Sequence, residues 1–380
     1  MRDPHLAMTR PLRAIALLCS TAIASFTASA QSTTLPPLPA PIGVPKPGPV
    51  TDAPYAPQPI VAGGVVVPLY AAGSPFLNAK RVREAEVYNV SQSVPGRINS
   101  IVNIHNPSIE FHPADRGMNT GAAVILVPGG GHNALVIGSE AADFVPYFYQ
   151  YGINTVILRY RLRRDGYNAE TDAVYDAQQA IRVVRAYAKE WNLDPNRIGI
   201  IGFSAGAELS APSALSFEEF DRKTGANDPF SGVSSRPDFV GIVYPGPTPF
   251  SVRNHTGPST FAARNPSPPP IPRNAPPAFM ASAGSGDRIH ALWAMDYAYA
   301  MLDAGVPNVE IHVYGNGRHP GDSLSDGGRM TGGLSAANSR PMSTWSARFI
   351  DWFRDLGFMQ KPGVETKAAR DIAAFAAQSH

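Results

Sequence analysis

The chain has 380 residues, of which 44% are hydrophobic and 16% are charged, and its formal net charge is +2. A chain of this length can bury a large core, and no extended block of Lys and Arg residues stands out in it. Nucleic acid and anionic membranes are therefore not expected as partners, because both bind proteins through clustered positive charge.

The first 30 residues have the pattern of an export signal. Arg2, Arg10 and Arg13 precede an apolar run over residues 14–26, and Ala28-Ser29-Ala30 then offers a site for cleavage before Gln31. The apolar run is too short for a stable span of a bilayer, which disfavours the alternative of an uncleaved membrane anchor. We expect a protein that is exported to the periplasm or out of the cell.

Removal of this segment changes the chemistry that the chain can offer. The only cysteine, Cys19, lies inside it, so the mature chain has no disulfide and no thiol chemistry. The segment also carries three Arg and one Asp, which account for the whole net charge of +2. The mature chain is therefore close to neutral.

Two proline-rich stretches divide the rest of the chain. Residues 35–60 contain ten prolines, which predicts an extended tether over 31–60 ahead of a globular domain over 61–360. Residues 266–277 contain seven prolines and belong to a predicted surface insertion at about 246–276. The sequence leaves open whether this insertion is a lid over a site or an inert loop. The tail over 361–380 is short and Ala-rich, and we expect at most a helix there.

From about residue 98, strand-like and helix-like segments alternate. The predicted strands are Ala122–Val127, Asn154–Leu158, Ile198–Ile201, Phe239–Tyr244, Phe279–Ala283 and Val309–Tyr314. The predicted helices are Glu140–Tyr151, Ala173–Trp191, Ala205–Phe217, His290–Ala304 and Met342–Leu356. The strands are apolar without strict alternation, which is typical of strands covered on both faces. The pattern predicts an α/β fold whose mainly parallel sheet binds ligands at the carboxyl ends of its strands.

Gly202-Phe203-Ser204-Ala205-Gly206 fits the pattern G-x-S-x-G, which in many enzymes holds a nucleophilic serine. A predicted strand precedes it and a predicted helix follows it. This context, a sharp turn between a strand and a helix, exposes the serine hydroxyl at the edge of a sheet. We predict that Ser204 is a nucleophile, against the alternative of a turn built from small residues for packing.

A serine hydroxyl needs a base to activate it and an acid to orient that base. Asp287 and His319 each follow a predicted strand, in the chain order Ser, Asp, His that is typical of α/β-hydrolases. Asp287 has the alternative role of capping the helix that begins near His290. His290 itself is a first-turn residue that either lines the pocket or faces solvent, and His312 lies inside a strand.

The glycine run Gly129-Gly130-Gly131 follows the predicted strand Ala122–Val127. Glycines at this place let backbone N–H groups point at a developing oxyanion. The predicted donors are the amides of Gly130 and Gly131, together with that of Ala205. The alternative, a phosphate-binding loop, is disfavoured because the spacing is not G-x-G-x-x-G and no Walker lysine follows.

From about Ile98 to Phe358 the chain resembles bacterial α/β-hydrolases of the acetylxylan esterase and feruloyl esterase type. The matching stretches are Pro128–His132, Glu140, Leu158–Leu162, Asp176–Arg182, Asp194–Gly199, Gly202–Gly206, Arg236–Phe239, Tyr244-Pro245, Asp287 and His319. The resemblance implies an α/β-hydrolase fold with Ser204 as nucleophile, Asp287 as acid and His319 as base. It also implies structural roles for Arg159, Arg161 and Asp176.

The chain departs from the family pattern at three places. Ala207 and Glu208 stand where family members often have Gly and His, and His132 stands where they usually have Tyr. Asp287 lacks the second acidic neighbour often found beside it. These departures bear on the shape of the pocket rather than on the predicted triad.

These observations predict an exported serine esterase that acts on acetyl or feruloyl esters, on plant polysaccharide or on smaller molecules. A general carboxylesterase for small esters and a serine peptidase of the same fold remain alternatives, and a non-catalytic carbohydrate-binding protein is a weaker one. No cofactor or metal is expected, because no H-E-x-x-H or clustered ligand pattern is present. The sequence does not indicate the oligomeric state.

Overall fold

The computed structural model describes residues 53–92, 94–224, 228–251, 267–320, 333–334 and 340–378, all within one compact unit, Pro36–His380. The predicted signal, most of the predicted tether and part of the predicted insertion lie outside these ranges. Within them, no helix combines the length and the apolar character that crossing a membrane requires.

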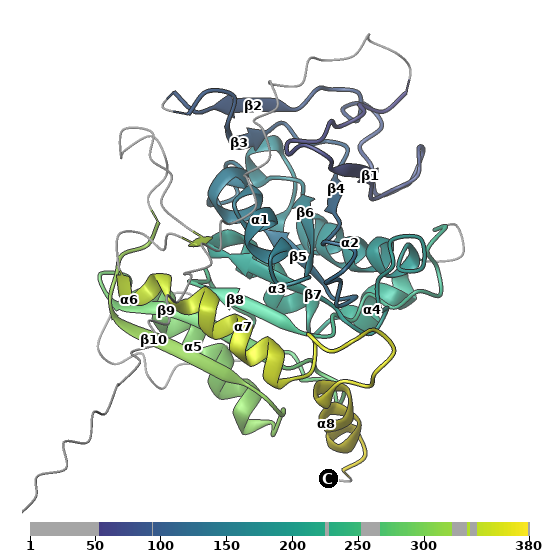
Figure 1. Cartoon of the computed structure of the whole chain (residues 1–380). Coiled ribbons are helices and arrows are strands. Elements are labelled where there is room, and N and C mark those ends of the chain that lie inside the picture. The colour runs from purple at the N-terminus through teal and green to yellow at the C-terminus, as the bar shows by residue number, and fades with distance from the viewer. Residues whose placement is uncertain are drawn as a thin grey trace, which may run out of the picture. The chain divides into compact units, whose positions relative to one another are not determined.

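A sheet of eight strands forms the centre of the domain (Figure 1). Its spatial order is β1, β4, β6, β5, β7, β8, β9, β10. From β6 to β10 every neighbouring pair is parallel, whereas β1, β4 and β6 pair antiparallel. The predicted strands correspond to β5 (Ala123–Val127), β6 (Asn154–Arg159), β7 (Ile198–Phe203), β8 (Val240–Val243), β9 (Ala278–Ser285) and β10 (Glu310–Asn316). The prediction of a mainly parallel sheet is therefore confirmed.

Four strands were not predicted: β1 (Val65–Pro68), β4 (Ser108–His112) and the pair β2 (Val87–Val90) and β3 (Ile98–Val102), which forms a separate two-stranded sheet. β4 is fully buried, yet it carries the charged residue Glu110. Glu110 is paired with the equally buried Arg159 of β6, whose Nη2 lies 2.5 Å from its Oε2. A strand that buries an ion pair lacks the apolar pattern by which a core strand is detected.

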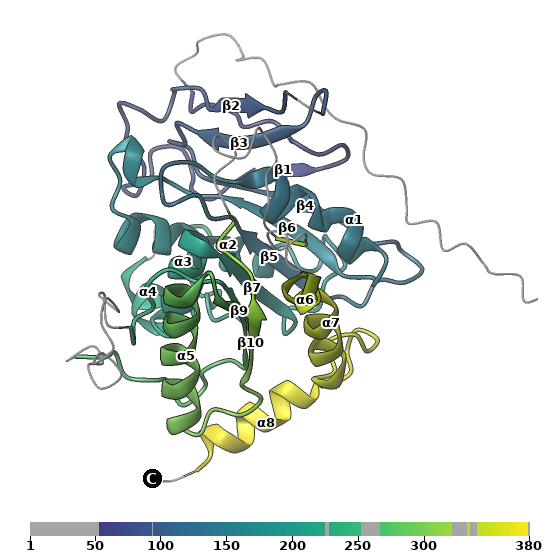
Figure 2. The ribbon, with the colours of Figure 1, turned by 90° about the vertical axis from the view of Figure 1, so that its left-hand side faces the viewer.

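Helices cover both faces of the sheet (Figure 2). On one side lie α2 (Val174–Ala186), α3 (Ala207–Ser213), α4 (Phe217–Lys223) and α5 (Arg288–Asp303), and on the other lie α1 (Phe144–Tyr149), α6 (Arg340–Ser343) and α7 (Trp345–Asp355). Two predicted helices are divided. The segment expected over 140–151 is a π-helical turn, Gly138–Ala142, followed by α1. The helix expected over 205–217 ends at Ser213, just after Pro212, which has no backbone N–H to donate.

The predicted apolar face of α7 packs on the sheet. Trp345, Phe349 and Phe353 are almost fully buried, and the Phe353 ring meets that of Phe239 at a centroid distance of 4.9 Å. The Trp345 indole also donates a hydrogen bond to the carbonyl of Gly333 (2.9 Å). Trp345 is thus a packing residue, as its helical spacing predicts.

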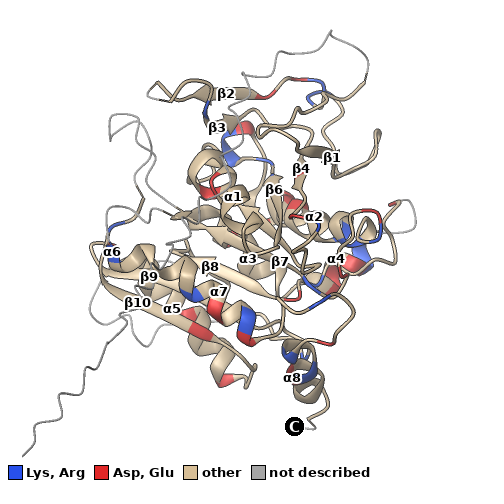
Figure 3. Ribbon diagram, viewed as in Figure 1, with Lys and Arg blue, Asp and Glu red and all other residues tan. Residues whose placement is uncertain are grey.

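Residues on both sides of the predicted domain boundaries pack against the domain. In the last part of the predicted tether, Ile60 donates its backbone N–H to Glu110. In the predicted tail, α8 (Lys367–Ala376) buries Ala368, Ile372 and Phe375. Acidic and basic residues are interspersed over the described elements (Figure 3), as the absence of a Lys/Arg block predicts.

Candidate active site

Ser204 lies at the carboxyl end of β7, on a short 3-10 turn (Ser204–Gly206) that leads into α3. Its φ of +51° is in the left-handed region, which a residue with a side chain adopts only at a cost. The flanking glycines make the turn possible: a Cβ on Gly202 would lie 2.4 Å from the carbonyl oxygen of Gly206, and one on Gly206 only 2.0 Å from that of Val127. The local sequence therefore holds the serine in a strained, partly exposed position.

The structure brings Ser204, His319 and Asp287 together from the ends of three strands. The hydroxyl of Ser204 lies 2.8 Å from Nε2 of His319, which follows β10, and Nδ1 of His319 lies 3.1 Å from Oδ2 of Asp287, which follows β9. Asp287 stands at the N-cap position of α5, but its side chain makes no capping hydrogen bond. Its carboxylate faces the histidine instead.

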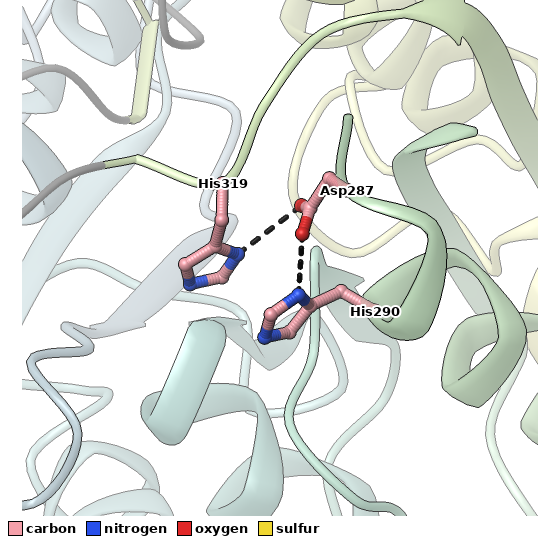
Figure 4. Close-up of side chains that lie close together, drawn as sticks. All are labelled: Asp287, His290 and His319. Carbon is pink, nitrogen blue, oxygen red and sulfur yellow. Dashed lines mark hydrogen bonds and ion pairs between the residues drawn. The ribbon is translucent and has the colours of Figure 1, made fainter. Parts of the chain in front are cut away.

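A second imidazole contacts the same carboxylate (Figure 4). Nδ1 of His290, in the first turn of α5, makes a short hydrogen bond to Oδ1 of Asp287. The rings of His290 and His319 are stacked, with centroids 3.7 Å apart and planes inclined by 16°. The sequence did not single out this arrangement, although the spacing of three residues between Asp287 and His290 at a helix start was a signal for it.

Both histidines favour the ionised form of Asp287. Burial by itself raises the pKa of this carboxyl group, but the hydrogen bonds from His290 and His319 outweigh burial and hold the pKa below its ordinary value. An ionised carboxylate only accepts hydrogen bonds, so each Nδ1 carries a proton and donates it. When the His319 ring is neutral, its Nε2 is unprotonated and faces the hydroxyl of Ser204.

Asp287, His290 and His319 also form the one group in the described part of the chain with the make-up of a metal site. One ligand atom from each lies within 4.8 Å of the others. Nitrogen and carboxylate ligands of this kind suit transition metals such as zinc. In this structure the carboxylate oxygens of Asp287 are hydrogen-bonded to Nδ1 of His290 and Nδ1 of His319.

The glycine loop after β5 lies beside Ser204. Gly130 has a φ of +123°, and a Cβ on it would lie 2.0 Å from the carbonyl oxygen of Ala134, so only glycine fits there. Among the residues that the structure describes, the amides of Gly130 and Gly131 donate to no acceptor. Ala205 lies at the start of a helix, where amides have no intrahelical partner. Within the described ranges, all three predicted donors are therefore available to a ligand oxygen.

Glu140, a buried residue of the π-helical turn, fixes the base of this loop. Its Oε2 accepts the backbone N–H of Gly129 (2.6 Å), and its Oε1 accepts the hydroxyl of Tyr244 (2.9 Å). The Tyr244 oxygen in turn accepts the N–H of Gly333 (2.8 Å). Burial raises the pKa of Glu140 to about 7, although both hydrogen bonds to the carboxylate act to lower it.

A cavity of about 600 Å³ opens in front of these residues. Its lining includes Ser204, His319, His290, Gly130 and Gly131. It also includes polar side chains from other elements, namely Asn89, Ser100, Asn133, Arg164 and Glu208. Trp293 and Pro247 contribute apolar surface. The site is thus a cavity with both polar and apolar walls, in which Trp293 supplies an indole surface.

Residues 111–255 match the BD-FAE family. Over 92 residues the chain is 39% identical to an acetylxylan esterase of Xylanibacter ruminicola. This alignment covers 24% of this chain and 18% of that protein. Over 156 residues it is 29% identical to a probable carboxylic ester hydrolase, LipM, of Mycobacterium tuberculosis. This alignment covers 38% of this chain and 34% of that protein. The chain spans well under half the length of these curated relatives.

Solved structures establish the fold. An acetyl ester-xyloside bifunctional hydrolase from Caldicellulosiruptor lactoaceticus superposes with a TM-score of 0.56 at 24% identity, over 78% of this chain and 97% of that one. A carboxylesterase from Lactobacillus plantarum superposes with a TM-score of 0.52 at 19% identity, over 66% of this chain and 93% of that one. The chain has the α/β-hydrolase fold that its sequence predicts, and it resembles α/β-hydrolases of the acetylxylan esterase type.

Proposed function

We propose that this protein is a serine esterase that hydrolyses carboxylic esters through Ser204, His319 and Asp287. The hydrogen-bonded series Ser204 Oγ, His319 Nε2, His319 Nδ1 and Asp287 Oδ2 is the observation that carries the proposal. This is the geometry that a nucleophile, its base and an orienting acid require. The similarity to ester hydrolases supports the same activity.

In the proposed reaction, Ser204 Oγ attacks the ester carbonyl carbon while Nε2 of His319 takes the hydroxyl proton. Asp287 stabilises the resulting imidazolium and keeps the ring oriented. The imidazolium then gives its proton to the leaving alcohol, and an acyl-enzyme remains. Water, activated by the same histidine, attacks the acyl carbonyl, and Ser204 regains its proton as the carboxylic acid leaves.

The amides of Gly130, Gly131 and Ala205 are the proposed donors to the oxyanion. A donor of this kind accelerates acyl transfer because it binds the charge that develops only in the transition state. Glu140 positions the loop through Gly129, so the donors are held in place before the substrate arrives. None of these steps needs a cofactor.

For the substrate we propose acetyl or feruloyl esters, on plant polysaccharide or on smaller fragments of it. The similarity to an acetylxylan esterase supports this class. So does the predicted export signal over residues 1–30, since a polymer is degraded outside the cytoplasm.

The proposal is tested by measuring acetate release from acetylated xylan and hydrolysis of p-nitrophenyl acetate, for the wild type and for Ser204→Ala. We expect activity on both substrates, lost in a variant that remains folded. Activity on the small ester alone would keep the mechanism and replace the substrate class by that of a general carboxylesterase. Near-native turnover by folded Ser204→Ala would refute the assignment of the nucleophile.

A further inference from the structure

Two residues at which the chain departs from its family pattern, His132 and Glu208, contact each other beside the nucleophile. Nε2 of His132 lies 3.1 Å from Oε2 of Glu208. His132 directly follows the oxyanion loop and is buried, whereas 27% of the Glu208 side chain is exposed. Glu208 also lines the cavity that contains Ser204, so its exposed part faces the place where a substrate binds.

Three segments of the fold hold this carboxylate in position. Glu208 lies four residues after Ser204, one turn along at the start of α3. A Cβ on Gly246 would lie 1.9 Å from Oε1 of Glu208, so the absence of a side chain there leaves room for the carboxylate. The backbone N–H of Gly246 is itself bound to the carbonyl of Ser204 (3.1 Å). His132, which contacts the carboxylate, has a left-handed φ of +59°.

The hydrogen-bond pattern defines what the carboxylate can bind. Nδ1 of His132 is buried and has no partner among the described residues, so the ring proton belongs on Nε2, where it is donated to Glu208. Oε1 of Glu208 accepts no hydrogen bond from the described part of the chain. A ligand group that faces Oε1 must therefore be a hydrogen-bond donor.

We propose that this cavity selects esters whose alcohol part carries a free hydroxyl group, as a sugar does, and that Glu208 accepts the hydrogen bond from that hydroxyl. The inference rests on the proposed esterase function and names the substrate class of the same site. Arg164 and Asn133 line the same cavity, and Arg164 is half exposed. Their donors, together with the Glu208 acceptor, suit a neutral polyol, which both donates and accepts hydrogen bonds.

The test compares two esters that differ by one hydroxyl group, 1,2-cyclohexanediol monoacetate and cyclohexyl acetate. We expect the wild type to hydrolyse the hydroxylated ester with a kcat/KM about tenfold or more above that for cyclohexyl acetate, since bound cyclohexyl acetate would cover the Glu208 carboxylate without giving it a hydrogen-bond donor. In Glu208→Gln this ratio should fall severalfold. Glu219→Gln, on the exposed face of α4, is the matched control and should keep the wild-type ratio.

A wild-type ratio near one would overturn the inference, as would a ratio that Glu208→Gln leaves intact. Faster hydrolysis of 4-aminocyclohexyl acetate than of the hydroxylated ester would overturn it in favour of a site for amines. If Glu208→Gln does not fold, the wild-type ratio of kcat/KM for the two esters still tests the inference. If the wild type hydrolyses p-nitrophenyl acetate but none of these esters, this inference alone is overturned. Failure on p-nitrophenyl acetate and acetylated xylan as well would refute the proposed function, and this inference with it.

Discussion

The rings of His290 and His319 lie face to face, 3.7 Å apart, and both direct Nδ1 to the carboxylate of Asp287. One carboxylate thus orients two imidazoles, only one of which reaches Ser204. The stack restricts rotation of the His319 ring, and the second hydrogen bond helps to keep Asp287 ionised. We therefore expect His290 to position the proposed base without reacting itself.

His290→Phe keeps a flat ring beside His319 but removes the hydrogen bond to Asp287. Because a hydrogen bond to a charged group contributes about 1.5–3 kcal/mol, we expect kcat to fall roughly tenfold or more, with KM little changed. The acid limb of the pH–rate profile should also shift, because Asp287 loses one of the two donors that lower its pKa.

His312→Phe is the matched control for this prediction. His312 lies on β10 and is bonded to Glu310, away from the cavity. Its removal should alter neither kcat nor the shape of the profile. Identical kinetics of His290→Phe and wild type would show that the stack and the second hydrogen bond have no positioning role.

Glu140 should make the stability of the protein depend on pH near neutrality. Its pKa rises from 4.5 to about 7 on folding, so folding favours the protonated form. The stabilisation is complete below about pH 4.5 and is lost as the pH rises through about 7, a change of roughly 3 kcal/mol. Urea unfolding at pH 5 and pH 8 measures it.

In Glu140→Gln this part of the pH dependence should disappear, whereas Glu190→Gln, an exposed carboxylate, should behave as the wild type. Tyr244→Phe removes a donor that favours the ionised form, so the loss of stability should move to higher pH. If the curves of wild type and Glu140→Gln run parallel from pH 5 to 8, Glu140 does not titrate in this range.

The two glycines proposed to supply the oxyanion hole should respond differently to alanine. In Gly130→Ala the new Cβ would lie 2.0 Å from a backbone oxygen, so the loop must move, and we expect kcat to fall about 100-fold or more. In Gly131→Ala the nearest atom is 3.6 Å away, and only the cost of a left-handed alanine remains, about 1–2 kcal/mol.

Steady-state kinetics together with thermal unfolding separate these effects. Gly131→Ala should lose stability with a much smaller loss of kcat than Gly130→Ala. Equal activities for the two variants would contradict the proposed role of the loop geometry.

The sequence predicts the parts of this molecule that depend on local patterns. The apolar strands β5 to β9 and the turn around Ser204 follow from composition and from glycine positions. Asp287 and His319 were found because both follow strands, whose carboxyl ends meet at one edge of a parallel sheet. β4 was missed because its Glu110 is neutralised by Arg159, a residue 49 positions away in the chain.

The side-chain contacts around the predicted triad could not be predicted from the sequence for the same reason. The contacts of Glu140 with Tyr244, and of His132 with Glu208, join segments 104 and 76 residues apart. His290 is the exception, since it lies one helical turn from Asp287. Its role depends on the His319 ring, which only the fold brings onto it.

The central claim is that Ser204 is the nucleophile, and labelling with a fluorophosphonate tests it most directly. We predict that one phosphonyl group is attached to Ser204, as located by mass spectrometry of the digested protein, in step with the loss of ester hydrolysis. Ser204→Ala should remain folded, unlabelled and inactive. Full labelling at another residue, or undiminished hydrolysis by Ser204→Ala, would contradict the account.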